Sequence, residues 1–182
     1  QYNFGGCLAD DMGLGKTVQT LSLLQQQKEA LKNSNDSKTS LLILPTSLVY
    51  NWQKEADKFA PQLRILLHTG SNRVKDAYAF THFDLIITTY GIIRSDEQLL
   101  STFFFNYIIL DESQNIKNPT SKSFKAIKLL KSRHKLALSG TPIENSVADI
   151  WSQMHFTNPG LLGSYTYFQK EFVAPIEKKK DE

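Results

Sequence analysis

The chain has one cysteine among its 182 residues, Cys7, so no disulfide can form within it. Cys7 lies in an apolar stretch, where we expect a small buried side chain in a reducing compartment. No apolar run approaches the roughly 18 residues that a membrane-spanning helix needs, and no signal peptide is visible. We therefore expect a soluble protein with no membrane partner.

An excess of charge of one sign is also lacking. Lys and Arg number 21 against 18 Asp and Glu, and the net charge of +3 is too small to indicate nucleic-acid binding by itself. The 4 histidines are scattered without the spacing of a metal site. Hydrophobic residues make up 41% of the chain, and its length suits one substantial core.

One stretch, GGCLADDMGLGKTVQT at residues 5–20, predicts a short buried strand, a glycine turn and the start of a helix. Gly13 and Gly15 let the backbone bend so that successive N–H groups converge on an anion. Lys16 adds a positive charge, Thr17 offers a hydroxyl to Mg²⁺, and the helix N-terminus favours phosphate. The stretch therefore predicts a nucleoside triphosphate site.

The phosphate-loop pattern is incomplete, because its first glycine would stand at position 10, where the chain has Asp10. Only G-x-G-K-T remains. Such a short pattern also fits a polar loop before an ordinary helix, so its interpretation depends on the rest of the chain.

Apolar runs of strand length alternate with stretches of helical spacing. The expected strands after the first are 41–44, 64–68, 84–88, 107–110 and 134–138, and the expected helices are 16–31, 47–59, 72–82, 92–100, 121–130 and 147–156. Repeated β-then-α units predict an α/β fold, a three-layer α/β/α sandwich with a mainly parallel central sheet.

Polar clusters follow these strands, and in parallel sheets ligands bind at the carboxyl ends of strands. Asp111 and Glu112 come directly after the most apolar strand, YIIL. A carboxylate there, near a Lys-Thr turn, is typical of a Mg²⁺ contact, and Glu112 could orient or deprotonate an attacking water. The alternative is a pair of solvated acids that begin a loop.

Two further features have ordinary structural interpretations. Trp52 shares helical spacing with Leu48 and Ala56, which favours a core side chain over one that stacks on a base. Residues 139–141, Ser-Gly-Thr, could cap the helix or turn that follows them.

Five blocks then stand in order: LADDMGLGKT, LILPTSLVYNWQKE, IITTY, ILDESQNIKN and LSGTPIEN, at residues 8–17, 42–55, 86–90, 109–118 and 138–145. In this order they strongly resemble the Swi/Snf group of helicase-like ATPases, over nearly the whole chain. The resemblance implies a RecA-like P-loop NTPase lobe that binds Mg·ATP and the backbone of duplex DNA. Residues 1–163 would be this first lobe, truncated upstream of residue 1, and 164–182 a helical extension that leads to a missing second lobe.

The resemblance also assigns roles by matching position. ATP would be bound by Asp11, Met12, Gly13, Leu14, Gly15, Lys16, Thr17 and Val18. Mg²⁺ would be held by Thr17 and Asp111, and the catalytic residues would be Lys16, Asp111, Glu112 and Gln114. Coupling of the γ-phosphate to lobe movement would fall to Gln114 with Ser139, Gly140 and Thr141. The DNA backbone would be contacted, without sequence readout, by Pro45, Thr46, Ser47, Thr88, Thr89 and Lys117.

Two departures from the family pattern matter. Gln114 stands where many eukaryotic members have histidine, which resembles prokaryotic members and favours the bacterial cytoplasm, close to the nucleoid, over a nucleus. The second lobe with its arginine finger, and an adenine-reading glutamine upstream of residues 1–6, lie outside the chain. We therefore expect these residues alone to hydrolyse ATP poorly, because the finger can contribute ~10³-fold or more in rate.

The interpretation is thus a DNA translocase that remodels protein–DNA complexes. Three alternatives remain: a lobe of a DEAD/DEAH-type helicase that acts on RNA, a non-catalytic module that docks on DNA or protein, and, more distantly, a small-molecule kinase. The PTSLVYNW and LSGTPIEN blocks argue against the first, and intact Lys16, Thr17, Asp111 and Glu112 argue against the second.

Overall fold

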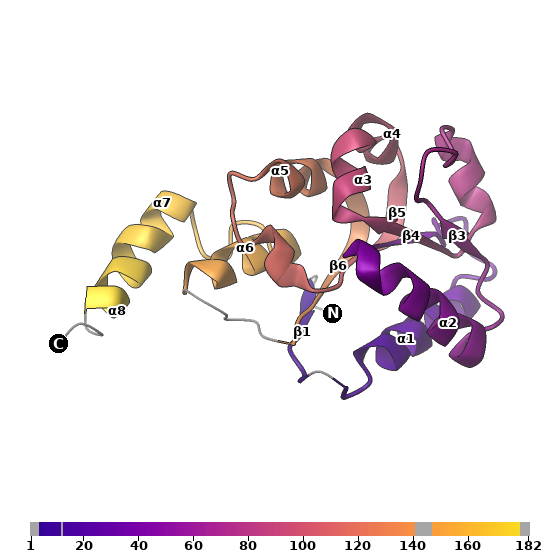
Figure 1. Cartoon of the computed structure of the whole chain (residues 1–182), viewed down its shortest axis with the longest axis horizontal. Helices are drawn as coiled ribbons and strands as arrows, with labels where there is room; N and C mark the ends of the chain where they lie inside the picture. Colours follow the sequence, from indigo (N-terminus) through magenta and orange to yellow (C-terminus); the bar gives the residue numbers. More distant parts are fainter. Residues whose placement is uncertain (1–3, 12, 141–146, 179–182) are drawn as a thin grey trace.

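A six-stranded sheet forms the centre of the molecule (Figure 1). The computed structural model describes residues 4–11, 13–140 and 147–178. The strands are β1 (Gly6–Leu8), β2 (Ser40–Leu44), β3 (Ile65–Leu67), β4 (Leu85–Thr89), β5 (Phe104–Leu110) and β6 (Lys131–Leu138). Their spatial order is β1-β6-β5-β2-β4-β3, and every pair is parallel.

Helices connect the strands and cover the sheet. They are α1 (Lys16–Ala30), α2 (Val49–Phe59), α3 (Tyr90–Ser95), α4 (Glu97–Ser101), α5 (Lys122–Leu129), α6 (Ala148–Thr157), α7 (Tyr165–Phe168) and α8 (Ala174–Lys178). Short 3₁₀ turns lie at Thr46–Leu48, Ala77–His82 and Ser113–Ile116, and a π-helical segment, Gln169–Val173, joins α7 to α8. In the described part of the chain, no helix is both long and apolar enough to span a membrane.

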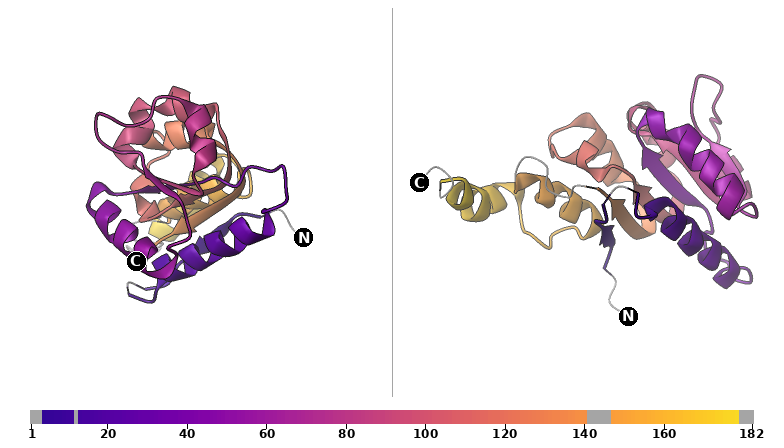
Figure 2. Two further views of the ribbon diagram at one scale, coloured as in Figure 1. Left: turned by 90° about the vertical axis from the view of Figure 1, so that its right-hand side faces the viewer. Right: turned by 60° about the horizontal axis from the view of Figure 1, so that its bottom comes forward.

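Strand β2 illustrates how the sheet separates two hydrophobic cores. All five of its residues are buried, and alternate side chains point to opposite faces. Leu41 and Ile43 pack into a core with side chains of α3, α4, α5 and α6, whereas Leu42 and Leu44 pack with α1 and α2. The two groups of helices lie on opposite sides of the sheet (Figures 1 and 2). The predicted three-layer α/β/α sandwich with a parallel sheet is therefore confirmed.

Two expected helices differ from the structure. Of residues 72–82, only Ala77–His82 are helical, as a 3₁₀ turn that Asp76 caps by accepting a hydrogen bond from the Tyr78 amide (2.9 Å). The expected helix 92–100 is split into α3 and α4 at Asp96, whose carboxylate is held by side chains from outside the helix. A local cap thus marks the late start of the first helical segment, whereas tertiary contacts hold the residue at which the second is divided.

The prediction that Cys7 is buried was wrong, because its strand lies at an edge of the sheet. Strand β1 has one hydrogen-bonded neighbour among the described strands, β6, and Cys7 is exposed. Partial burial of the thiol still raises its pKa.

The helical segment from α7 to α8 lies beyond α6, at the opposite end of the molecule from β3 (Figures 1 and 2). Phe168 and Val173 attach it to the core beneath α5 and α6. The Trp151 indole also donates a hydrogen bond to the Gly163 carbonyl (3.2 Å), which fixes the turn before α7.

Candidate nucleotide and DNA site

The glycine turn lies between β1 and α1, at the carboxyl edge of the sheet. Gly13 and Gly15 have φ of 87° and 81°, a left-handed conformation that other residues adopt only with strain. Gly15 is also the N-cap residue of α1, which has neither a side-chain cap nor an acidic residue in its first turn. Within the described part of the chain, the first amides of α1 are thus left to an anion such as a phosphate.

Lys16 folds back onto the turn that it follows. Its ammonium donates to the backbone carbonyls of Asp10 (2.7 Å) and Asp11 (3.0 Å). Gln19 adds a longer contact to the Asp10 carboxylate (3.3 Å). These are exchangeable partners, because a triphosphate is a stronger acceptor for an ammonium than a neutral carbonyl.

The other predicted nucleotide residues lie around the same turn. Asp11 and Leu14 are exposed, Thr17 and Val18 are half-buried on the first turn of α1, and Met12 lies outside the described residues.

The carboxylate pair lies at the end of β5. Asp111 is buried, and its Oδ1 accepts a hydrogen bond from the Glu112 amide (2.9 Å) while its Oδ2 accepts one from the Trp52 indole (2.7 Å). Burial raises the pKa of Asp111, and the Trp52 hydrogen bond opposes that shift. Glu112 has a φ of 49°, the one positive φ of a non-glycine residue in the ranges described. Strained backbone of this kind is concentrated at functional sites.

A cavity of about 240 Å³ joins the glycine turn to the carboxylates. Its lining combines backbone and charged groups from three segments: Gly13, Gly15, Lys16, Thr17, Leu48, Asn51, Trp52, Glu55, Asp111 and Glu112. One hydroxyl and buried carboxylate oxygens beside an anion-binding turn are the donors that Mg²⁺ prefers when it arrives with phosphates. The residues present therefore fit a magnesium nucleotide.

A chain of hydrogen bonds connects Glu112 to the end of β6. The Gln114 amide donates to Glu112 Oε2 (2.6 Å), and the Ser139 hydroxyl donates to Gln114 Oε1 (3.1 Å). Ser139 is fully buried, and Gly140 after it is half-buried. Sequence reasoning grouped Gln114 with Ser139, and the fold brings them together. Thr141, of the same group, lies outside the described residues.

The residues expected to contact DNA fall into an exposed set and a buried set. Pro45 is half-buried, whereas Thr46 and Ser47 are exposed on the 3₁₀ turn that leads from β2 into α2. Lys117 is exposed, and its carbonyl accepts a hydrogen bond from the Ser152 hydroxyl (2.8 Å). These side chains are available to a ligand.

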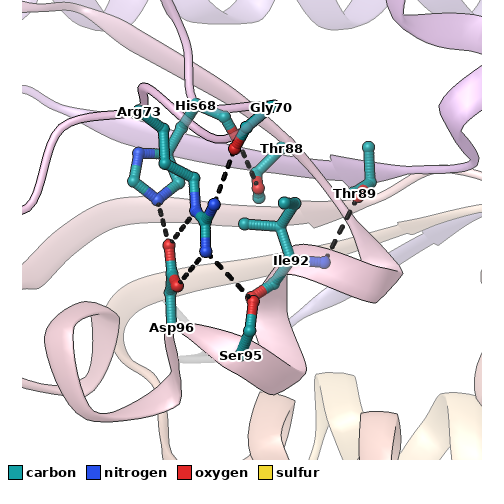
Figure 3. Close-up of polar contacts among 8 residues, drawn as sticks. All are labelled: His68, Gly70, Arg73, Thr88, Thr89, Ile92, Ser95 and Asp96. Carbon is teal, nitrogen blue, oxygen red and sulfur yellow. Dashed lines mark hydrogen bonds and ion pairs between the residues drawn. The ribbon is translucent and has the colours of Figure 1, made fainter.

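Thr88 and Thr89 are buried and use their hydroxyls internally (Figure 3). The Thr88 hydroxyl donates to the His68 carbonyl (2.9 Å), and Thr89 Oγ1 caps α3 by accepting from the Ile92 amide (3.3 Å). Their hydroxyls are therefore engaged within the protein, and the segment is held firmly in place.

Behind this segment lies a cluster of charged side chains (Figure 3). The Asp96 carboxylate accepts hydrogen bonds from two guanidinium nitrogens of Arg73 (2.5 and 2.6 Å) and contacts His68 Nε2 (2.8 Å). The Arg73 hydrogen bond lowers the pKa of Asp96, and burial lowers the pKa of His68. We refer to His68, Arg73 and Asp96 as the Asp96 cluster.

Sequence reasoning missed four residues that the fold brings to the site. Asn51, Trp52 and Glu55 on α2 line the cavity. Tyr90, the first residue of α3, donates its hydroxyl to the Asp111 carbonyl (2.8 Å). The spacing of Asn51 and Glu55 places them on one face of a helix, which can be seen in the sequence. Which part of the molecule that face contacts depends on the order of the strands.

The chain is also similar to known proteins. A family model, the SNF2-related domain, matches residues 1–182. The chain is 48% identical, over all of its length, to the putative ATP-dependent helicase/translocase YwqA of Bacillus subtilis, and it covers 20% of that protein. It is 37% identical to the TATA-binding protein-associated factor MOT1 of Saccharomyces cerevisiae, again over 100% of the chain but 10% of MOT1. The chain thus spans a fifth or less of these relatives.

A solved structure resembles the fold as well. The Sulfolobus solfataricus SWI2/SNF2 ATPase core in complex with dsDNA matches with a TM-score of 0.84 and 48% identity, over 96% of this chain and 36% of that one.

Proposed function

The chain belongs to the SNF2-related family, and from that premise we propose that it is the first ATP-binding lobe of a DNA-dependent ATPase that moves along duplex DNA and remodels protein–DNA complexes. The observation that carries the proposal is the cavity that joins the glycine turn to Asp111 and Glu112. The S. solfataricus relative, an ATPase core in complex with dsDNA, supports the choice of nucleotide and nucleic acid.

In this function the turn and the first turn of α1 hold the triphosphate. Asp11, Met12, Gly13, Leu14, Gly15 and Val18 surround it, and Lys16 exchanges its carbonyl partners for phosphate oxygens. Thr17 and Asp111 would hold Mg²⁺, which supplies neutralising charge to the phosphates when bound.

Glu112 is the group that orients the attacking water and accepts its proton. Gln114 donates to Glu112 Oε2 and so holds that carboxylate, and it accepts a hydrogen bond from the Ser139 hydroxyl. Through Ser139, Gly140 and Thr141, we propose, the state of the γ-phosphate reaches a second RecA-like lobe elsewhere in the longer protein.

The DNA backbone lies, in this proposal, along Pro45, Thr46, Ser47, Thr88, Thr89 and Lys117. Thr46, Ser47 and Lys117 contribute side chains, because these are exposed. The buried Thr88 and Thr89 contribute the position of their backbone. Such contacts fix a phosphate chain without reading its bases, as movement along any sequence requires.

Two finer proposals follow. Residues 164–182 lead out of this lobe toward the second one, whose arginine finger would complete the ATP site, so the 182 residues alone hydrolyse ATP slowly. Gln114 favours a bacterial cytoplasmic protein that works on the nucleoid.

The test is ATP hydrolysis by the full-length protein with duplex DNA, single-stranded DNA, RNA or no nucleic acid, beside the Lys16→Ala variant. We expect strong stimulation by duplex DNA that the variant loses. Stimulation by RNA would instead indicate a DEAD/DEAH-type helicase, and tight DNA binding without turnover would indicate a docking module.

A further inference from the structure

Two of the segments proposed to contact DNA are each connected to the carboxylate pair by one aromatic side chain. Helix α2 follows Pro45–Leu48 directly and carries Trp52. Helix α3 follows Thr88 and Thr89 directly and begins with Tyr90. Both side chains donate hydrogen bonds to Asp111.

Trp52 fixes the orientation of the Asp111 side chain. The indole has one donor, and it is used at 2.7 Å on Asp111 Oδ2, with Trp52 only 3% exposed. The Glu112 amide occupies Oδ1 of the same carboxylate. A hydrogen bond to an ionised group is short and strong, so a displacement of α2 must turn this carboxylate.

Tyr90 fixes the backbone of the pair. Its hydroxyl lies 2.8 Å from the Asp111 carbonyl and 3.5 Å from the Glu112 carbonyl. Glu112 has the left-handed φ of 49°, and a strained residue keeps its conformation only when its surroundings impose it. Tyr90 is one such constraint, so its position determines where the Glu112 side chain points.

The segment that carries Tyr90 is held at both ends by hydrogen bonds. Thr89 caps α3 and Thr88 is bonded to the His68 carbonyl, while the far end of α3 is held by the Asp96 cluster (Figure 3). A shift imposed on Thr88 and Thr89 is thus passed to Tyr90 instead of being absorbed by a loose loop.

We propose that Trp52 and Tyr90 are positioning residues that make Asp111 and Glu112 respond to DNA. The inference rests on the proposed function, because it takes residues 45–47 and 88–89 as DNA contacts. DNA that fixes both segments fixes the carboxylates in one geometry. A displacement of about 1 Å can cost ~10²-fold in rate, so this restriction is large enough to control turnover.

The experiment compares Trp52→Phe and Tyr90→Phe in the full-length protein. Each removes one donor and keeps an aromatic ring. We expect the ratio of DNA-stimulated to basal kcat to fall by about 10-fold or more, whereas the Kd for duplex DNA stays within about 2-fold. The Mg²⁺ concentration that half-saturates nucleotide binding, measured by calorimetry, should rise in Trp52→Phe.

Two matched controls separate positioning from folding. Tyr50→Phe alters an exposed tyrosine of α2, and Trp151→Phe removes the hydrogen bond from a buried tryptophan to the Gly163 carbonyl, away from the cavity. Both should keep the stimulation ratio and the Mg²⁺ dependence. Melting temperatures of all four variants show whether Trp52→Phe loses more stability than Trp151→Phe. If Trp52→Phe does not fold, Tyr90→Phe, which lacks only a hydroxyl, still decides the question.

The inference is overturned if both variants keep the wild-type stimulation ratio, or if their DNA affinity falls in parallel with it. A wild-type protein that duplex DNA does not stimulate would contradict the proposed function instead. In that case an unchanged Mg²⁺ dependence in Trp52→Phe would still overturn the positioning of Asp111.

Discussion

The two halves of the nucleotide cavity are held in different ways. On the phosphate side, Gly13 and Gly15 are exposed and Lys16 is bonded to carbonyls of its own loop. On the other side, Asp111 is buried and receives hydrogen bonds from α2 and α3 as well as from the next residue. The phosphate half must exchange partners when a ligand binds, whereas the carboxylate half already has its hydrogen-bond partners from α2 and α3.

The largest effects on this difference are expected from Glu112→Gln and Lys16→Ala, compared in the full-length protein. Loss of a general base costs about 10²–10⁴-fold in kcat, and we expect Glu112→Gln to keep nucleotide affinity because, in the proposed function, Glu112 acts on water. Lys16→Ala should lose affinity, because its charge is proposed to act on phosphate. Single-turnover hydrolysis measures the rate of the chemical step, and calorimetry measures nucleotide affinity. If both variants lost only the rate, or both lost only the affinity, the two halves of the cavity would not differ as described.

A smaller effect is expected from Gly15→Ala. Among the described residues, apart from its two chain neighbours, no atom lies within 4 Å of the added Cβ, so the cost arises from the φ of 81° and amounts to about 1–2 kcal/mol. We expect roughly 10-fold weaker nucleotide binding if the turn relaxes to avoid this strain. Gly91→Ala in α3 is the control, since its nearest contact is an ordinary 3.8 Å; its affinity for nucleotide should not change.

The smallest effect is expected from the Asp96 cluster, which holds the segment that carries Tyr90. Burial lowers the pKa of His68, so its contribution to stability is complete above the ordinary histidine pKa of about 6.5 and is lost as the pH falls through the lower folded value. The pKa of Asp96 is lowered as well, chiefly by Arg73, so its contribution persists until the pH falls below the ordinary value of about 3.9.

His68→Gln should therefore flatten the dependence of melting temperature on pH just below about pH 6.5 and leave the steep loss at lower pH. His82→Gln, at an exposed histidine outside the Asp96 cluster, serves as the matched substitution control. An unchanged slope in His68→Gln would mean that the Asp96 cluster does not titrate with folding.

Much of the fold followed from local pattern. The apolar run at 41–44 predicted a strand buried in a parallel sheet, and residues 84–88 predicted another strand; β2 and β4 confirm both. The five ordered blocks predicted the Swi/Snf family, which the SNF2-related match confirms. The RecA-like lobe predicted with it agrees with the SWI2/SNF2 ATPase core structure. Individual site roles remain predictions, although Gln114 and Ser139 do meet.

The rest depended on partners far away in sequence. Helical spacing placed Trp52 in the core, but its indole finds Asp111 only because β5 lies beside β2 in the sheet. The division of the expected helix 92–100 at Asp96 also involves a distant partner, because Asp96 pairs with Arg73, which no local pattern connects to it. Exposure of Cys7 likewise followed from strand order.

The pairing of β1 with β6 has a consequence for synthesis on the ribosome. Leu8 is in register with Leu138, and the Ser139 amide donates to the Leu8 carbonyl (3.1 Å). The strand before the glycine turn therefore pairs with a strand that lies far from it along the sequence. Closing so long a segment is entropically costly until the strands between are in place. A nascent chain that has not yet emerged through residue 138 therefore lacks the described partner of β1, and we expect the proposed ATP pocket to form only after β6 has left the exit tunnel.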